Sequence, residues 1–363
     1  MPLSNDRLRI GVVFGGRSAE HDVSVLSATN VMAALDPAKY DAVPIFITRE
    51  GKWLLSGYAN GVLEQPVSGT EVCLMPGGEG RMIALEGDGR ARELGKLDIL
   101  FPVLHGLPGE DGSVQGLTET ACMPLAGCGI AGSATALDKD IAKRLLNEAG
   151  IPAARSVTIR RDDVPAFDVL EKALGLPVFV KPARQGSSVG VSKVTGKAGY
   201  AAALEEGFKY DRVLLAEEFI KGREIECAVI EAPDGSLFVS RPGEIVPAES
   251  HGFYSYDAKY IDADGALLKV PAELPEAVET AIRETAAKAF RAVGCDAMAR
   301  VDFFLREDMS FLVNELNTIP GFTDISMYSK VMAASGISYS EIIDRLVSHG
   351  LARAAQAARN RAG

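Results

Sequence analysis

Three oxygen-bearing side chains in the last quarter of the chain have the types and spacing of a metal site. Asp302 lies in one predicted strand, and Glu315 and Asn317 lie in the next. Side chains two residues apart on a strand share a face, and a short turn within residues 307–310 would bring Asp302 beside them. Mg²⁺ prefers oxygen ligands and, at nucleotide sites, completes its octahedron with phosphate and water. We predict a magnesium site here, although this pattern alone is more typical of a solvated edge hairpin.

A lysine followed by a glycine- and serine-rich loop predicts a phosphate site. Lys181 ends a predicted strand, and PARQGSSVG follows it directly. Successive backbone N–H groups in such a loop form a concave nest for phosphate oxygens, and the ammonium adds a point charge. The segment lacks the GxxxxGK[ST] pattern, and an ordinary hairpin turn explains it equally well.

A third segment, FYSYDAKY at 253–260, places three tyrosines and Lys259 in an otherwise polar loop. We interpret it as a flap that closes over a site and excludes water from phosphate chemistry. Aromatic side chains more often serve packing, so the segment gains weight only from the other two.

The first third of the chain predicts an open α/β unit that would position part of the site. Strands are expected at 9–15, 41–48 and 97–104, with a helix over 23–35 after the Gly15-Gly16 turn. Short hairpins are expected between about 52 and 93.

The remainder predicts a small α+β unit and then an antiparallel sheet with amphipathic helices. Helices are expected over 138–149, 198–206, 274–293 and 339–351, and strands over 177–181, 190–194, 213–217, 225–230 and 237–240, before the hairpin described above. The alanine- and arginine-rich end of the chain tends toward low complexity.

Composition excludes several classes of function. The 363 residues fit two or three domains, and the net charge of −11 argues against nucleic-acid or anionic-membrane partners. Five cysteines without a CxxC pair indicate neither zinc nor a disulfide framework. No apolar run reaches membrane-spanning length and no leader is indicated, so we expect a cytoplasmic protein.

Taken together, these segments resemble the D-alanine–D-alanine ligase family of the ATP-grasp superfamily, over nearly the whole chain. Seven motifs in the family's order carry the resemblance: GGRSAEHDVS (15–24), HGLPGEDGSVQG (105–116), ALDKDIAK (136–143), VKPARQGSSVGVSKV (180–194), EEFIKGREIECAV (217–229), FYSYDAKY (253–260) and RVDFF with NELNTIPGFT (300–304, 314–323). Several ordered motifs are far more specific than one glycine pattern.

The resemblance implies a mixed α/β and α+β, three-domain ATP-grasp fold. A Rossmann-like open-sheet domain would span 1–133, a small central α+β domain 134–224 and an antiparallel-sheet domain 225–363. It also implies a homodimer. The implied activity joins two D-alanines through an acyl phosphate, releasing ADP and phosphate, for peptidoglycan precursor synthesis.

The resemblance further implies the residues that bind ATP and metal. Contacts to ATP would come from Lys139, Lys181, Gly186, Ser187, Ser188, Glu217, Glu218, Phe219, Ile220, Glu224 and Lys259. Asp302, Glu315 and Asn317 would hold two Mg²⁺ ions, with Mn²⁺ as an alternative.

On the substrate side, the resemblance places Glu20 on the ammonium of the first D-alanine, with His105 nearby. Ser187 would link Glu20 to Tyr260, and Arg300 with the N–H of Gly321 would form an oxyanion hole. The carboxylate of the second D-alanine would meet Ser326, with Met327 beside it.

Three alternatives stay open from the sequence. A ligase that takes D-lactate or D-serine second would share every nucleotide residue, although Tyr260 favours an amine over a hydroxyl acceptor. A non-catalytic nucleotide-binding protein would not need Arg300 and Gly321. A dinucleotide-dependent oxidoreductase is weakly supported, because the first turn lacks GxGxxG.

Overall fold

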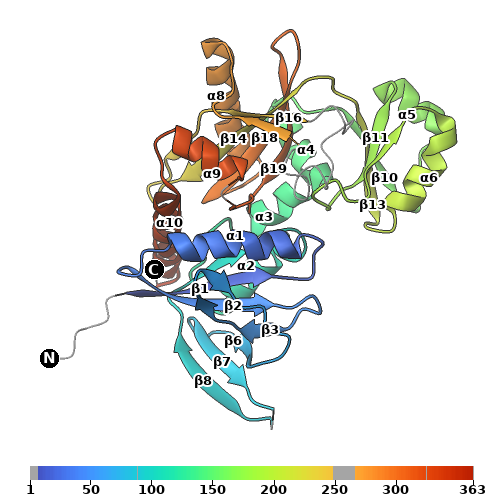
Figure 1. The fold of residues 1–363 in the computed structure, drawn as a ribbon. Coiled ribbons are helices and arrows are strands. Elements are labelled where there is room, and N and C mark those ends of the chain that lie inside the picture. Colours follow the sequence, from blue (N-terminus) through green and yellow to red (C-terminus); the bar gives the residue numbers. More distant parts are fainter. Residues whose placement is uncertain (1–6, 88, 248–265, 324, 363) are drawn as a thin grey trace.

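The computed structural model describes residues 7–87, 89–247, 266–323 and 325–362. It contains three main sheets, and Figure 1 shows the central one standing to one side of the other two. None of the helices in those ranges has the length and apolar character needed to cross a membrane.

The N-terminal sheet has seven strands in the order β8-β7-β6-β3-β2-β1-β9. Its parallel core is β1 (Leu8–Gly15) between β2 (Tyr40–Ile47) and β9 (Ile99–Val103), and antiparallel strands β3 (Trp53–Leu55), β6 (Glu71–Leu74), β7 (Arg81–Leu85) and β8 (Ala91–Lys96) extend it. A small hairpin of β4 (Tyr58–Ala59) and β5 (Val62–Leu63) and helices α1 (His21–Ala34) and α2 (Ser113–Thr120) complete this part. Since β1 is apolar and covered on both faces, its carboxyl end can carry a loop in a fixed position.

The central sheet is antiparallel, in the order β10-β13-β11-β12. Its strands are β10 (Ser156–Arg160), β11 (Val178–Pro182), β12 (Ser192–Val194) and β13 (Val213–Glu218), and α5 (Phe167–Leu174) and α6 (Lys197–Gly207) pack on one face. Val180 and Ala216 point into that helix-covered core. Because side chains alternate along a strand, Lys181 and Glu217 lie on the opposite face.

The C-terminal sheet follows the order β17-β16-β14-β18-β19, with β15 paired to β14. Its strands are β14 (Arg223–Glu231), β15 (Leu237–Val239), β16 (Gly243–Pro247), β17 (Ala266–Lys269), β18 (Met298–Leu305) and β19 (Phe311–Asn317). Helices α3 (Ile130–Leu137), α4 (Lys139–Glu148) and α8 (Glu276–Ala292) share a core with it. On the other side, α9 (Met327–Ala334) and α10 (Tyr339–Ala362) join it to the N-terminal sheet in one continuous core.

The expected strands are confirmed, and each expected helix has a counterpart in α1, α4, α6, α8 or α10. The mixed fold class with an open N-terminal sheet is confirmed with them. The helix expected over 339–351 is longer in the structure, because α10 continues through the alanine- and arginine-rich end to Ala362. Alanine and arginine are strong helix formers, so the segment extends the helix. Each sheet falls in one of the three expected segments apart from the first residues of β14, and the domain boundaries stay a prediction.

Candidate active site

The β18–β19 hairpin brings the three expected metal ligands together. Asp302 pairs with Glu315 across the hairpin, and Arg300 pairs with Asn317. The Asn317 Nδ2 donates to Asp302 Oδ2 at 3.0 Å, and Arg300 donates to both Asp302 oxygens at 2.7 Å. Lys139 Nζ lies 3.3 Å from Glu315 Oε2. Acidic and basic groups therefore converge on one side of the hairpin.

This donor set fits a hard divalent cation that keeps open positions. Two carboxylates and one amide oxygen are the ligand types that Mg²⁺ prefers, and they are fewer than an octahedron needs. Among the described residues, no group of three or more His, Cys, Asp or Glu is arranged to hold a metal ion. A cation here would therefore complete its shell with phosphate and water.

A buried ionic cluster lies on the face of the central sheet opposite α5 and α6. Lys181 Nζ is 2.7 Å from Glu217 Oε2, and Lys143 Nζ is 3.2 Å from Glu217 Oε1. The three side chains are only 13%, 4% and 5% exposed for Lys181, Lys143 and Glu217. Two ammonium groups share one carboxylate, so the cluster carries surplus positive charge.

Burial and charge act in opposite directions in this cluster. Burial lowers the pKa of Lys181, Glu217 opposes that change, and Lys143 and Lys139 add to it. Burial alone would raise the pKa of Glu217, but Lys181 and Lys143 outweigh it and hold that pKa below its usual value. The carboxylate therefore stays ionised, and an anion that approached the lysines would relieve their repulsion.

The glycine-rich loop after β11 has an unusual backbone at its two serines. Ser187 and Ser188 adopt φ of 50° and 60°, a backbone region that residues other than glycine rarely occupy. Such residues cluster at functional sites, where the surroundings hold them in place. The Ser187 hydroxyl donates to the Glu20 carboxylate, and Lys139 Nζ donates to the Gln185 carbonyl at 2.8 Å. The loop thus contacts both the N-terminal part and α4.

The segment after β13 places apolar side chains against both the central and the C-terminal sheets. Ile220 is buried with Ala154 and Leu312. The Phe219 ring lies 6.0 Å from that of Phe179. This surface has the character that a flat heteroaromatic ring requires.

The two other expected nucleotide residues of this segment lie on different strands. Glu218 faces away from the ionic cluster and bonds to Arg155 at 2.6 and 2.8 Å. Glu224 sits near the start of β14, opposite Phe304 of β18.

Glu20 lies at the start of α1, between two glycine turns. A Cβ added at Gly106 would come within 2.8 Å of Glu20 Oε2, and one at Gly186 within 3.4 Å. His105 is buried nearby, with Nε2 3.0 Å from Ser27 Oγ and Nδ1 3.0 Å from the Ile319 carbonyl. Burial lowers the pKa of His105, with Glu20 opposing.

The loop after β19 places Gly321 against the start of α9. A Cβ at Gly321 would lie 2.7 Å from Ser326 Oγ, so a side chain there would displace the serine. Ser326 precedes the first residue of α9 and accepts from the Thr323 N–H at 3.0 Å. Met327 is buried, and its sulfur packs against Gly243.

Lys259 and Tyr260, with the rest of the expected flap, lie outside the described residues. Their roles stay predictions from the sequence.

Two buried groups in the site were missed by sequence reasoning. Lys143 is four residues after Lys139 on α4, a spacing that puts both on one helix face and could have been noticed. Glu110 accepts the Gly106 N–H at 2.7 Å. Burial and the neighbouring Glu20 raise the pKa of Glu110 to about 8, and hydrogen bonds from the Gly106 and Ile319 backbone act against that rise. Only the fold reveals this carboxyl pair.

Comparison with known proteins agrees with this geometry. Family models described as the D-ala D-ala ligase N-terminus and C-terminus match residues 9–128 and 145–348. The D-alanine–D-alanine ligase A of Brucella suis is 69% identical over 351 residues, covering 97% of this chain and 99% of that protein.

Two solved structures are similar throughout. The D-alanine–D-alanine ligase of Coxiella burnetii has a TM-score of 0.84 at 33% identity, covering 98% of this chain and 97% of that one. The VanG D-Ala:D-Ser ligase of Enterococcus faecalis has a TM-score of 0.82 at 35% identity, covering 94% and 99%. With two family models spanning most of its length, this chain belongs to the D-alanine–D-alanine ligase family and is an ATP-dependent ligase with the ATP-grasp fold.

Proposed function

We propose that this chain joins two D-alanines into D-alanyl-D-alanine, converting one ATP to ADP and phosphate. The observation that carries the proposal is a junction of three parts of the fold. The glycine-rich loop of the central sheet bonds through Ser187 to Glu20 of the N-terminal part. Beside it, Lys139 of α4 meets Glu315 of the C-terminal hairpin. A site assembled in this way can hold a nucleotide against a small amino acid.

The nucleotide is proposed to lie between the central and C-terminal sheets. Its adenine would lie against the apolar side chains of Phe219 and Ile220, with Glu224 at the ribose. Lys139 and Lys181 would face the phosphates, and the N–H groups of residues 186–188 would cradle them. These groups supply positive potential within an acidic chain.

Asp302, Glu315 and Asn317 are the proposed ligands of two Mg²⁺ ions, with Mn²⁺ as an alternative. Bound there, the cation would neutralise phosphate charge and orient the terminal phosphoryl group. The oxygen donors on the hairpin and the adjacent lysine support this placement.

The first D-alanine is proposed to bind with its ammonium group at Glu20, which Ser187 holds in place. One carboxylate oxygen then attacks the γ-phosphorus, the bond to the β–γ bridging oxygen breaks, and ADP leaves. The product is an acyl phosphate, which water would hydrolyse. The expected flap with Lys259 and Tyr260 would exclude that water.

The second D-alanine is proposed to bind with its carboxylate at Ser326 and the N-terminus of α9, where helix N–H groups favour an anion. Its amine attacks the acyl carbon, and Arg300 with the Gly321 N–H stabilises the oxyanion. The amide bond forms as phosphate leaves, taking the original carboxylate oxygen with it. The amine proton would pass to the departing phosphate or to Tyr260.

The test is to measure phosphate and dipeptide with ATP, Mg²⁺ and D-alanine as the only amino acid. Equal amounts of phosphate and D-alanyl-D-alanine would support the proposal, and ATP binding without turnover would contradict it. Parallel reactions with added D-serine or D-lactate test the acceptor, because the Enterococcus faecalis relative is a D-Ala:D-Ser ligase. The expected homodimer is tested by sedimentation.

A further inference from the structure

The loop that carries Gly321 belongs to the C-terminal part, but side chains of the N-terminal part hold it on both sides. On one side, the Ile319 carbonyl lies 3.0 Å from His105 Nδ1. On the other, the Phe322 N–H donates to Ser27 Oγ at 3.3 Å. Ser27 Oγ is also 3.0 Å from His105 Nε2. Ser27 and His105 thus bridge the peptide groups that flank Gly321.

The direction of these hydrogen bonds is fixed by chemistry. A carbonyl can only accept, so His105 Nδ1 carries the proton that reaches Ile319. Burial favours the neutral ring, so Nε2 is the acceptor and the Ser27 hydroxyl donates to it. The Ser27 oxygen then has lone pairs for the Phe322 N–H. Both ring nitrogens of His105 are therefore engaged by protein groups. Hydrogen bonds run from the Ile319 carbonyl through His105 and Ser27 to the Phe322 N–H.

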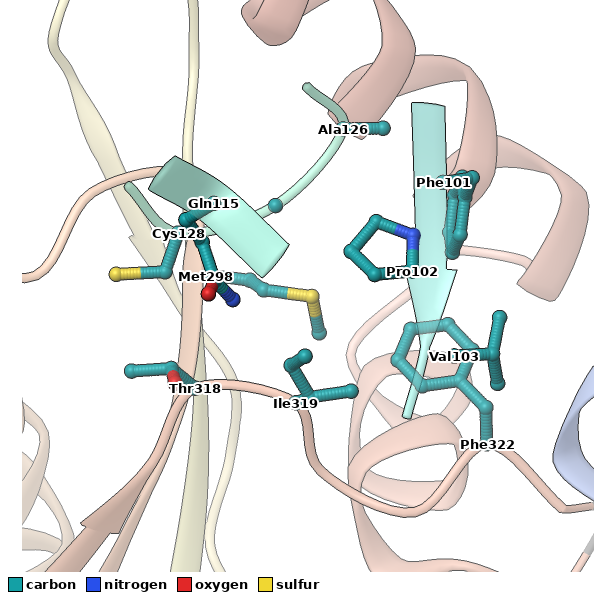
Figure 2. Close-up of a pocket in the computed structure, with 11 residues that line it drawn as sticks. Phe101, Pro102, Val103, Gln115, Ala126, Cys128, Met298, Thr318, Ile319 and Phe322 are labelled. Carbon is teal, nitrogen blue, oxygen red and sulfur yellow. The ribbon is translucent and has the colours of Figure 1, made fainter. Parts of the chain in front are cut away.

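The remaining surroundings of the loop also restrict it. Figure 2 draws Ile319, Phe322 and Pro102 among the residues that line a small cavity. That cavity has a volume of about 10 Å³, room for at most one water molecule. The Phe322 carbonyl accepts from the Tyr339 hydroxyl at 2.7 Å. The loop is therefore packed on its apolar side and bonded at both polar groups of residue 322.

We infer that Ser27 is a positioning residue for the oxyanion hole, acting through His105 and the Phe322 peptide to aim the Gly321 N–H at the reacting carbonyl. This inference rests on the proposed function, in which that N–H stabilises the second step. Donors of this kind act only when held at the oxyanion's position, and small displacements are costly. Because Ser27 lies in α1, the N-terminal part would set the geometry of a donor in the C-terminal part.

The test is Ser27→Ala, measured on the two steps separately. ATP carrying ¹⁸O in its β–γ bridge scrambles the label when the acyl phosphate forms reversibly, and dipeptide formation reports the complete reaction. Loss of a whole oxyanion donor costs about 100-fold or more, and Ser27→Ala displaces the Gly321 N–H without removing it. We therefore expect a smaller effect, a roughly tenfold rise in the ratio of scrambling to dipeptide formation. KM for ATP should be unchanged.

Ser240→Ala is the matched control. Ser240 is also fully buried, accepts the Ala228 N–H at 3.0 Å and donates to the Arg241 carbonyl at 2.8 Å. The Ser240→Ala variant should lose about as much stability as Ser27→Ala and keep the wild-type ratio of scrambling to dipeptide formation. If Ser27→Ala does not fold, Ser27→Cys, which keeps the size and a weak donor, should show a smaller rise in the same ratio.

An unchanged ratio in the folded Ser27 variant, whether both steps slow equally or neither slows, would overturn the inference. A wild-type enzyme that makes no dipeptide would instead overturn the proposed function. The two failures are therefore distinguished by the wild-type reaction.

Discussion

Glu217→Gln removes the carboxylate that two buried lysines share, and its cost can be worked from the structure. Lys181 and Lys143 lie 2.7 and 3.2 Å from Glu217, and none of the three side chains is more than 13% exposed. Breaking a buried pair leaves an uncompensated charge and costs about 3–5 kcal/mol. Since the glutamine oxygen can still accept one hydrogen bond, we expect a loss of about 3 kcal/mol. For a chain of 363 residues that loss lowers Tm by about 4 °C.

The same variant should change the pH dependence of ATP binding. Phosphate binding needs the Lys181 ammonium. ATP should therefore bind below the pKa of that lysine and bind less well above it. Burial already lowers that pKa, and Glu217 is the main group opposing the change. Glu217→Gln should therefore move the alkaline loss of ATP binding to lower pH, measured as KM for ATP against pH.

The stability difference should also depend on pH. The folded-state pKa of Glu217 is below its ordinary value, so its contribution is present above the unfolded-state pKa of a glutamate. That contribution is lost as the pH falls through the folded-state pKa, and the gap between wild type and variant should close there.

Glu279→Gln is the control, because its carboxylate pairs with a half-exposed Arg241 outside the site at 2.9 and 3.0 Å. We expect a loss of at most about 1 kcal/mol and no change in the ATP profile. A loss below about 1 kcal/mol in Glu217→Gln, together with an unshifted alkaline limb, would refute the reasoning from buried charge.

Three further variants test other parts of the site. Glu315→Gln should reduce magnesium-dependent turnover about 100-fold and lower stability less than Glu217→Gln does, because Glu315 is 23% exposed and Lys139 keeps its hydrogen bond to the Gln185 carbonyl. An unchanged rate at limiting Mg²⁺ would exclude the hairpin as the metal site. Ser187→Ala should raise the KM for the first D-alanine about tenfold, because the Glu20 carboxylate loses a charge-assisted hydrogen bond; unchanged KM would count against that link. The wild type should lose activity as the pH rises through about 8, because the raised pKa of Glu110 means that its carboxyl is neutral below about 8 and ionises beside Glu20 above it. Glu110→Gln should stay active at pH 7 and lack that decline. A decline that persists in the variant would assign it to another group.

The sequence predicted those parts of the site that follow from local periodicity. Strand alternation placed Glu315 and Asn317 on one face, and the hairpin register brought Asp302 to them. The strand before the glycine-rich loop was also predictable, because its short apolar run ends at the lysine.

Contacts between distant elements could not be predicted in this way. Lys143 reaches Glu217 only because α4 packs beside the central sheet, and the two residues are 74 positions apart. Ser27 and Phe322 meet across 295 positions. Short helices such as α3 and α9 were missed because eight residues rich in alanine, glycine or serine give little periodic signal. Their position is set by tertiary packing.

The central claim is that the carboxylate of the first D-alanine attacks the terminal phosphoryl group of ATP. It is tested most directly with D-alanine labelled with ¹⁸O in both carboxylate oxygens, by mass analysis of the phosphate released. We expect one labelled oxygen in each phosphate and one labelled oxygen retained in each new amide carbonyl. Phosphate without label, formed in step with dipeptide, would contradict it.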